Sequence, residues 1–90
     1  MNMIKLSETT PCILAFEGGV LECFFDEGGS KRIHITHIKG IQIDAASKGK
    51  CLLTIKLKND QVFLWVDEGI VARVKDFVAQ IQKEMTTFKL

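Results

Sequence analysis

Histidine and cysteine, the residue types that most often bind zinc or act as a nucleophile–base pair, are few in this 90-residue chain. The two histidines, His34 and His37, are three positions apart, and the three cysteines lie elsewhere, at Cys12, Cys23 and Cys51. A zinc site needs three or four ligands that converge on one ion. Residues three apart in an extended segment point to opposite faces, so this spacing argues against a metal site unless a kink re-aims one ring.

The sequence also lacks a pairing suited to covalent catalysis or phosphate binding. Cys51 takes an inward position in an alternating run and has no histidine close to it in sequence. The cysteines are odd in number and form no CxxC motif, which is typical of reduced core residues. Gly18-Gly19 and Gly28-Gly29 neither open a helix nor precede a GK[ST] element, so they predict turns. We therefore expect no enzyme activity, no metal and no cofactor.

Two large aromatic residues, Phe63 and Trp65, lie in an alternating run that follows a turn about Asn59-Asp60. With a two- or four-residue connection, the pairs Leu57/Val62, Ile55/Leu64 and Leu53/Val66 face one another. Both aromatic residues then lie on the opposite face, together with Leu52, Thr54 and Lys56. A three-residue loop reverses this assignment and buries both aromatic residues.

If the aromatic residues lie on the outer face, they form a candidate surface for a protein partner. Its residues are Phe63, Trp65, Leu52 and Lys56. Hydrophobic residues make up 47% of the chain, a high share for a domain with so little interior, so some apolar surface is expected to remain outside.

A second candidate surface is basic. Residues 31–50 carry one acidic residue, Asp44, and a net charge of +4. Their basic residues are Lys31, Arg32, Lys39, Lys48 and Lys50. These side chains could meet an anionic surface such as a lipid headgroup or a nucleic-acid backbone, or they could form an ordinary solvated strand face. The whole chain has a net charge of only +1, which argues against nucleic-acid binding.

Alternation of apolar and polar residues predicts the strands that position these surfaces. A short strand is possible at 3–6, and Cys12–Phe16 and Val20–Phe25 flank a two-residue turn at Gly18-Gly19. In this hairpin Phe16 faces Leu21 and Leu14 faces Cys23. Residues 26–30 form the next turn, 47–50 a later one, and 51–57 and 62–66 a second hairpin.

The alternation changes phase between residues 36 and 40. Ile33 and Ile35 point inward, and the inward positions resume at Ile41, Ile43 and Ala45. Ile38 fits neither run, so the backbone must turn or bulge there. The phase change either separates two strands or marks one bent strand that passes between sheets.

The last segment has a helical period from Gly69 to Met85. Its apolar residues recur every three or four positions, at Ile70, Val74, Phe77, Val78, Ile81 and Met85. Such a stripe predicts a helix that packs on the sheets. Asp67 is expected to cap its first turn, and residues 86–90 are expected to fray.

The order of these elements resembles the pleckstrin-homology-like (PH-like) fold of small bacterial domains. The likeness lies in residues 32–43 (RIHITHIKGIQI) and 50–55 (KCLLTI), followed by the aromatic strand 62–66 and the helix. It implies a mostly β fold of six to seven strands in two nearly orthogonal antiparallel sheets, closed at one end by the C-terminal helix. Lipid-binding members carry a basic cluster in the first long hairpin, where this chain has Glu17, Gly18, Gly19 and Glu22, and this difference argues against phosphoinositide binding.

We expect residues 1–90 to form a single domain, because no linker or low-complexity segment divides the chain. The N-terminus lacks the apolar stretch of a signal peptide, and no run approaches the length of a membrane span, so we expect a cytoplasmic protein. The predicted function is a non-catalytic interaction module that binds a protein partner or self-associates through apolar sheet or helix surface. The alternative is an anionic-surface binder that uses the basic residues between 31 and 50.

Overall fold

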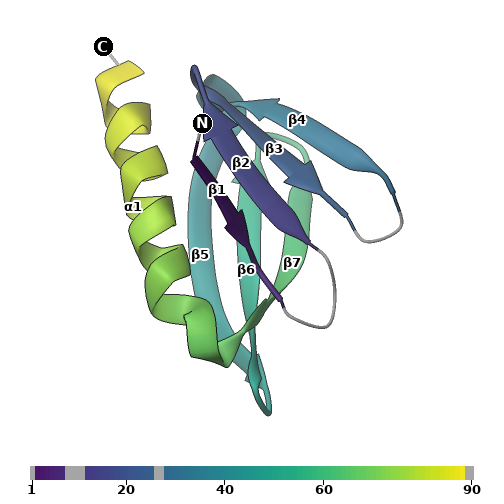
Figure 1. The fold of residues 1–90 in the computed structure, drawn as a ribbon. Coiled ribbons are helices and arrows are strands. Elements are labelled where there is room, and N and C mark those ends of the chain that lie inside the picture. Colours follow the sequence, from purple (N-terminus) through teal and green to yellow (C-terminus); the bar gives the residue numbers. More distant parts are fainter. Residues whose placement is uncertain (1, 8–11, 26–27, 89–90) are drawn as a thin grey trace.

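The structure is a computed structural model that describes residues 2–7, 12–25 and 28–88. It places the chain in two antiparallel sheets and one long helix (Figure 1). The four-stranded sheet has the order β1 (Asn2–Lys5), β2 (Ile13–Glu17), β3 (Val20–Phe24) and β4 (Ser30–His34). The three-stranded sheet has the order β5 (Ile38–Ser47), β6 (Lys50–Leu57) and β7 (Gln61–Asp67), and α1 (Val71–Phe88) ends the chain. The prediction of a mostly β fold with one C-terminal helix and two antiparallel sheets is confirmed.

The first hairpin has the predicted register. Phe16 pairs with Leu21 and Leu14 pairs with Cys23, and the connection is the two-residue turn Gly18-Gly19. Both glycines have a positive φ, 59° and 78°, which a residue with a side chain rarely adopts. Of the turn predicted at 26–30, residues 26 and 27 lie outside the described part of the chain.

The phase change in the sequence marks the point where the chain passes from one sheet to the other. A 3₁₀ turn, Ile35–His37, follows β4, and β5 begins at Ile38 in the second sheet. The Ile35 N–H donates to the Gly19 carbonyl at 2.9 Å, and the register of β5 shifts between Ile38 and Gly40. The predicted break is confirmed, and it separates two strands.

The second hairpin differs from its predicted register by two residues. Ile55 pairs with Val62 and Leu53 pairs with Leu64. The Leu57 N–H donates to the Asp60 carbonyl, so the turn between the strands is Lys58-Asn59. The predicted pairs Leu57/Val62, Ile55/Leu64 and Leu53/Val66 are therefore wrong. Because side chains alternate between the two faces of a strand, a shift of two positions leaves each side chain on the face where it was predicted. Phe63 and Trp65 therefore lie on the outer face, as a two- or four-residue connection predicted.

The C-terminal helix starts with a 3₁₀ turn, Glu68–Ile70, and continues as α1. Two local predictions were wrong. The Asp67 side chain makes no capping hydrogen bond, and residues 86–88, which were expected to fray, continue the helix, where Thr86 and Thr87 donate to the carbonyls of Gln82 and Lys83. Residues 89 and 90 of the predicted tail lie outside the described part of the chain. Within the described residues, no helix is long and apolar enough to cross a bilayer.

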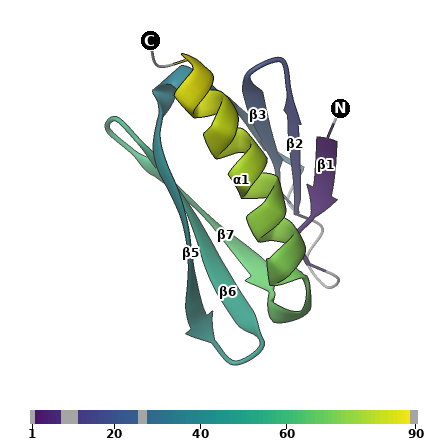
Figure 2. The same ribbon diagram turned by 90° about the vertical axis from the view of Figure 1, so that its left-hand side faces the viewer.

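The helix lies over the side of the molecule between β1 and β5, the edge strands of the two sheets (Figures 1 and 2). The Asn2 amide donates to the Gln80 side chain at 3.3 Å, and the Gln82 amide donates to the Ile41 carbonyl at 3.4 Å. One helix therefore contacts an edge of each sheet.

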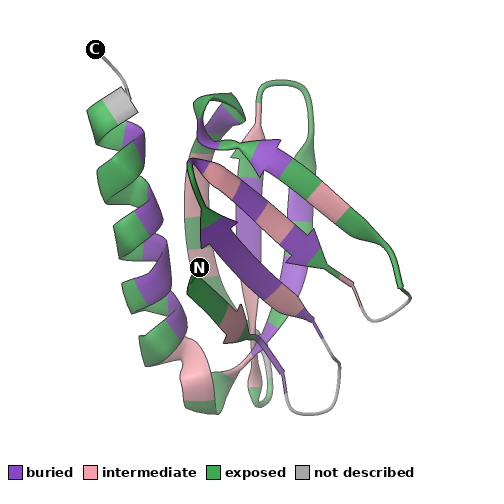
Figure 3. Cartoon of the chain, turned by 45° about the horizontal axis from the view of Figure 1, so that its top comes forward, coloured by how far each residue is buried: buried purple, intermediate pink, exposed green. Residues whose placement is uncertain are grey.

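The core lies between the inner faces of the sheets and the helix (Figure 3). Its most buried members from the strands and the 3₁₀ turn include Leu14, Leu21, Cys23, Ile35, Ile38, Leu53, Ile55 and Val66. The helix stripe adds Val74, Phe77, Val78, Ile81 and Met85. Ala45 was predicted to point inward but is exposed, because the β5–β6 turn projects beyond the rest of the molecule (Figure 1).

We predict that Leu53→Ala and Leu52→Ala, at neighbouring positions of β6, differ in stability. Leu53 is fully buried, so its truncation leaves a cavity and should lower the free energy of unfolding by about 2–5 kcal/mol. Leu52 lies on the outer face and is half-buried, so its truncation should cost less. Urea unfolding followed by circular dichroism gives both values, and equal losses would contradict the assignment of the two faces.

Candidate functional site

Two aromatic side chains lie exposed on the outer face of β7, an edge strand of the three-stranded sheet. Phe63 is 55% exposed and Trp65 is 51% exposed. Across the ladder, Phe63 is opposite Thr54, which is buried, and Trp65 is opposite Leu52, which is half-buried. Of the two arrangements that the sequence left open, the structure has the exposed one. We call Phe63, Trp65 and Leu52 the aromatic patch.

Polar residues border this patch. On β5, Gln42 pairs with Thr54 and Asp44 pairs with Leu52, and the Gln42 amide donates to the Asp44 carboxylate at 2.6 Å. Lys56 and Gln61 form the next cross-strand pair beyond Thr54 and Phe63 on the same face, and both are exposed. An apolar centre with a polar rim is the usual composition of a protein interface.

Other exposed apolar side chains in the described residues are less well grouped. Met3 is 57% exposed and Phe24 is 36% exposed, on the four-stranded sheet. They lie in different rows of that sheet, on strands separated by β2. Phe63 and Trp65 share one face of one strand, so the aromatic patch is the more continuous surface.

The basic residues of the second candidate surface do not gather in one place. Lys39 lies near the start of β5 and Lys48 in the turn after its end, and the ten-residue strand between them spans about 30 Å when extended. Arg32 is opposite Glu22 in the other sheet. The Lys31 ammonium lies 3.3 Å from the Asp60 carboxylate.

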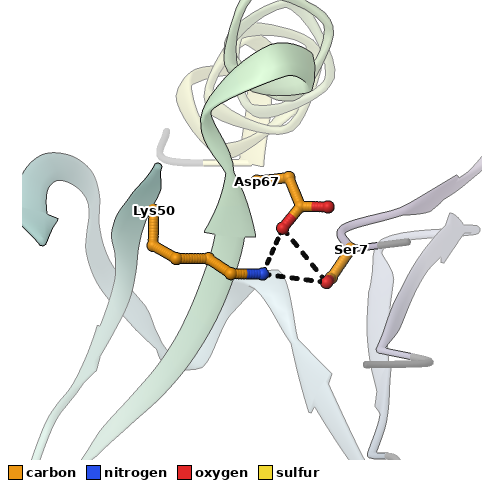
Figure 4. Close-up of polar contacts among 3 residues, drawn as sticks. All are labelled: Ser7, Lys50 and Asp67. Atoms are coloured by element: carbon orange, nitrogen blue, oxygen red, sulfur yellow. Dashed lines mark hydrogen bonds and ion pairs between the residues drawn. The ribbon is translucent and has the colours of Figure 1, made fainter. Parts of the chain in front are cut away.

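Lys50, the fifth basic residue, belongs to a polar cluster with Asp67 and Ser7 (Figure 4). The Lys50 ammonium donates to the Asp67 carboxylate and, at 3.1 Å, to the Ser7 hydroxyl, which donates to Asp67 at 3.1 Å. The Asp67 N–H donates to the Leu6 carbonyl at 2.9 Å, so the cluster fixes the segment after β1 to the end of β7. The Lys50 and Asp67 side chains are only 30% and 20% exposed, so this lysine is not free for a ligand.

Sequence reasoning missed this cluster. Lys50 and Asp67 are paired across the β6–β7 ladder, so a correct hairpin register would have brought them together. Ser7 is 43 residues from Lys50, and no local pattern indicates that contact.

Groups with intrinsic reactivity are few in the described structure. The 3₁₀ turn brings the His34 and His37 rings to a centroid separation of 6.4 Å, but the His34 Nδ1 accepts from the Thr36 N–H. Among the residues that the structure describes, no three metal-binding side chains come together. Burial raises the pKa of the Cys23 thiol to about 12, which keeps it protonated at neutral pH.

No match to this chain was found among protein-family models, curated proteins or solved structures. Its function is therefore inferred from the surfaces described above.

We predict that Lys31→Met raises the pKa of the Asp60 carboxylate without restoring its usual value. Two neighbours lower this pKa, first the Gln61 N–H, which donates to the carboxylate at 2.8 Å, and then the Lys31 ammonium. The Gln61 N–H remains in the variant, so part of the shift should persist. NMR titration of the Asp60 carboxyl carbon measures both pKa values, and an unchanged pKa would contradict the ion pair.

The same shift gives a sign for the pH dependence. Because the pKa of Asp60 is lower in the folded chain, its contribution to stability is present above the pKa of the unfolded chain. That contribution is lost as the pH falls through the lower, folded value. Lys31→Met should therefore lose less stability than the wild type over this acidic range.

Proposed function

We propose that this chain is a non-catalytic, PH-like interaction module that binds a protein partner or a second copy through the aromatic patch. The observation that carries the proposal is the exposure of Phe63 and Trp65 side by side on one strand face. Aromatic side chains bury 150–250 Å² when fully covered, so about 100 Å² of each remains for a partner. At about 25 cal/mol per Å², covering both gives about 5 kcal/mol before the cost of association.

The order of elements supports the PH-like part of this proposal. Four strands form one antiparallel sheet, three form the other, and the helix comes last, as the resemblance implies. The helix covers the side between β1 and β5 (Figure 2). Because neither sheet is closed on itself, the outer face of β7 stays available beside a free edge.

Binding to an anionic surface has less support from the same structure. Lys31 and Lys50 are each held by an aspartate, and Lys39 and Lys48 lie at opposite ends of β5. An anionic surface would therefore meet isolated positive charges, which attract it weakly at physiological salt.

We predict that Trp65→Ala weakens association while lowering the free energy of unfolding by less than about 1 kcal/mol, because the side chain is half exposed. Phe24→Ala is the matched control, since it also removes an exposed ring but from the other sheet. Light scattering over a dilution series and affinity capture from lysate measure association with copies and with other proteins.

The control variant should behave like the wild type in both measurements. Two outcomes would refute the proposal: unchanged association of Trp65→Ala in both measurements, or an equal loss in Phe24→Ala.

A further inference from the structure

The hydrogen-bond pattern of the second hairpin shows which backbone groups of β7 are directed away from β6. In an antiparallel ladder, residue pairs that exchange hydrogen bonds alternate with pairs that do not. Leu57 and Asp60 form a bonded pair, so the bonded pairs beyond it involve Val62, Leu64 and Val66. The remaining positions of β7 direct their N–H and C=O groups outward, and these are Gln61, Phe63, Trp65 and Asp67.

Two of these four positions already have partners for their N–H groups. The Gln61 N–H donates to the Asp60 carboxylate at 2.8 Å, and the Asp67 N–H donates to the Leu6 carbonyl at 2.9 Å. For Phe63 and Trp65, no backbone hydrogen bond to another described residue exists on this side. The edge of β7 is thus capped at both ends and open at the two residues whose rings are exposed.

We propose that a second copy of this chain pairs its own β7 antiparallel to this edge, with Phe63 of each copy opposite Trp65 of the other. This inference rests on the proposed function and names the partner. Each Phe63 and each Trp65 then exchanges both backbone hydrogen bonds across the two-fold axis, so the open N–H and C=O groups of these two residues find partners. The sequence Val62-Phe63-Leu64-Trp65-Val66 suits this pairing, because residues of similar type lie symmetrically about Leu64.

The outer-face side chains are complementary in this arrangement. The two aromatic patches join into one apolar strip across the axis, since Phe63 and Trp65 form cross-strand pairs. In the end rows, Gln61 of one copy is opposite Asp67 of the other, and Lys56 lies beyond Gln61 in the same row. The Asp67 carboxylate is already bound by Lys50 of its own copy, so these end rows add a polar rim to the interface and no new ion pair.

The area involved predicts a weak dimer. The four rings supply about 400 Å², and the paired backbones add to this without reaching the size of a standard stable interface, about 1,600 Å². The dimer should therefore form at high protein concentration and dissociate on dilution.

Sedimentation velocity over a dilution series of the full chain tests this pairing with two substitutions at one position. Trp65→Ala removes the indole ring but keeps the backbone N–H, whereas Trp65→Pro removes both the ring and the backbone N–H. The Trp65 N–H is not part of the ladder with β6, so proline is compatible with this edge position. We expect a dimer in the wild type and in Phe24→Ala, at least tenfold weaker association in Trp65→Ala, and a monomer at every concentration in Trp65→Pro.

Amide hydrogen exchange of the wild type gives a second measurement that does not depend on whether the proline variant folds. The amides of Phe63 and Trp65 should exchange slowly at high protein concentration and quickly on dilution, while the amide of Lys56 should not respond. A wild type that stays monomeric, or a dimer in which these two amides remain unprotected, would overturn the pairing. Equal association of Trp65→Pro and Trp65→Ala would also overturn it.

These results separate the pairing from the proposed function. A monomeric wild type that captures another protein, with capture lost in Trp65→Ala, refutes the dimer and supports the interaction module. If the wild type is monomeric and Trp65→Ala captures other proteins as well as the wild type does, both the dimer and the proposed function of the aromatic patch are refuted.

Discussion

The two sheets share one small core, and this shared burial constrains the rest of the structure. Each strand can bury only one face, so every element must keep its apolar positions in phase with that core. Where the chain leaves the first sheet, the 3₁₀ turn at Ile35–His37 changes the phase, and both Ile35 and Ile38 remain buried. The inner faces and the helix stripe together fill the interior, and the outer face of β7 carries its aromatic residues in solvent.

Local signals in the sequence predicted much of this fold. Gly18-Gly19 specified a tight turn that requires positive φ, and the misplaced Ile38 located the change of sheet. The parts that failed depend on contacts outside the local pattern. The register after Leu57 depends on which residues close the turn with Asp60, and the conformation of Asp67 depends on Lys50 and Ser7 from other strands. For the candidate site, the sequence identified Phe63 and Trp65 but left their exposure open, since one residue more or less in that turn reverses the faces.

Charge counted along the sequence also gave an incomplete description of the surface. The basic stretch looked like one feature, but two of its lysines make contacts within the fold. Lys31 reaches from β4 to Asp60 before β7, and Lys50 binds Asp67 at the end of β7, next to Ser7. The first pair is exposed and contributes little by itself, whereas the second is partly shielded from water. Together they hold β7 at both ends and leave the middle of its outer edge uncovered.

The position of α1 has a consequence for how far the three-stranded sheet can grow by adding strands. The helix lies over the first part of β5, where the Gln82 side chain donates to the Ile41 carbonyl, whereas the part of β5 that leads into the β5–β6 turn extends beyond the helix (Figure 2). A sheet with two open edges can extend indefinitely into fibres, and natural proteins often prevent this by covering an edge. A strand added at β7 leaves only the far part of β5 as an edge of this sheet. The helix that completes the core therefore also shortens the second edge on which edge-to-edge polymerisation depends.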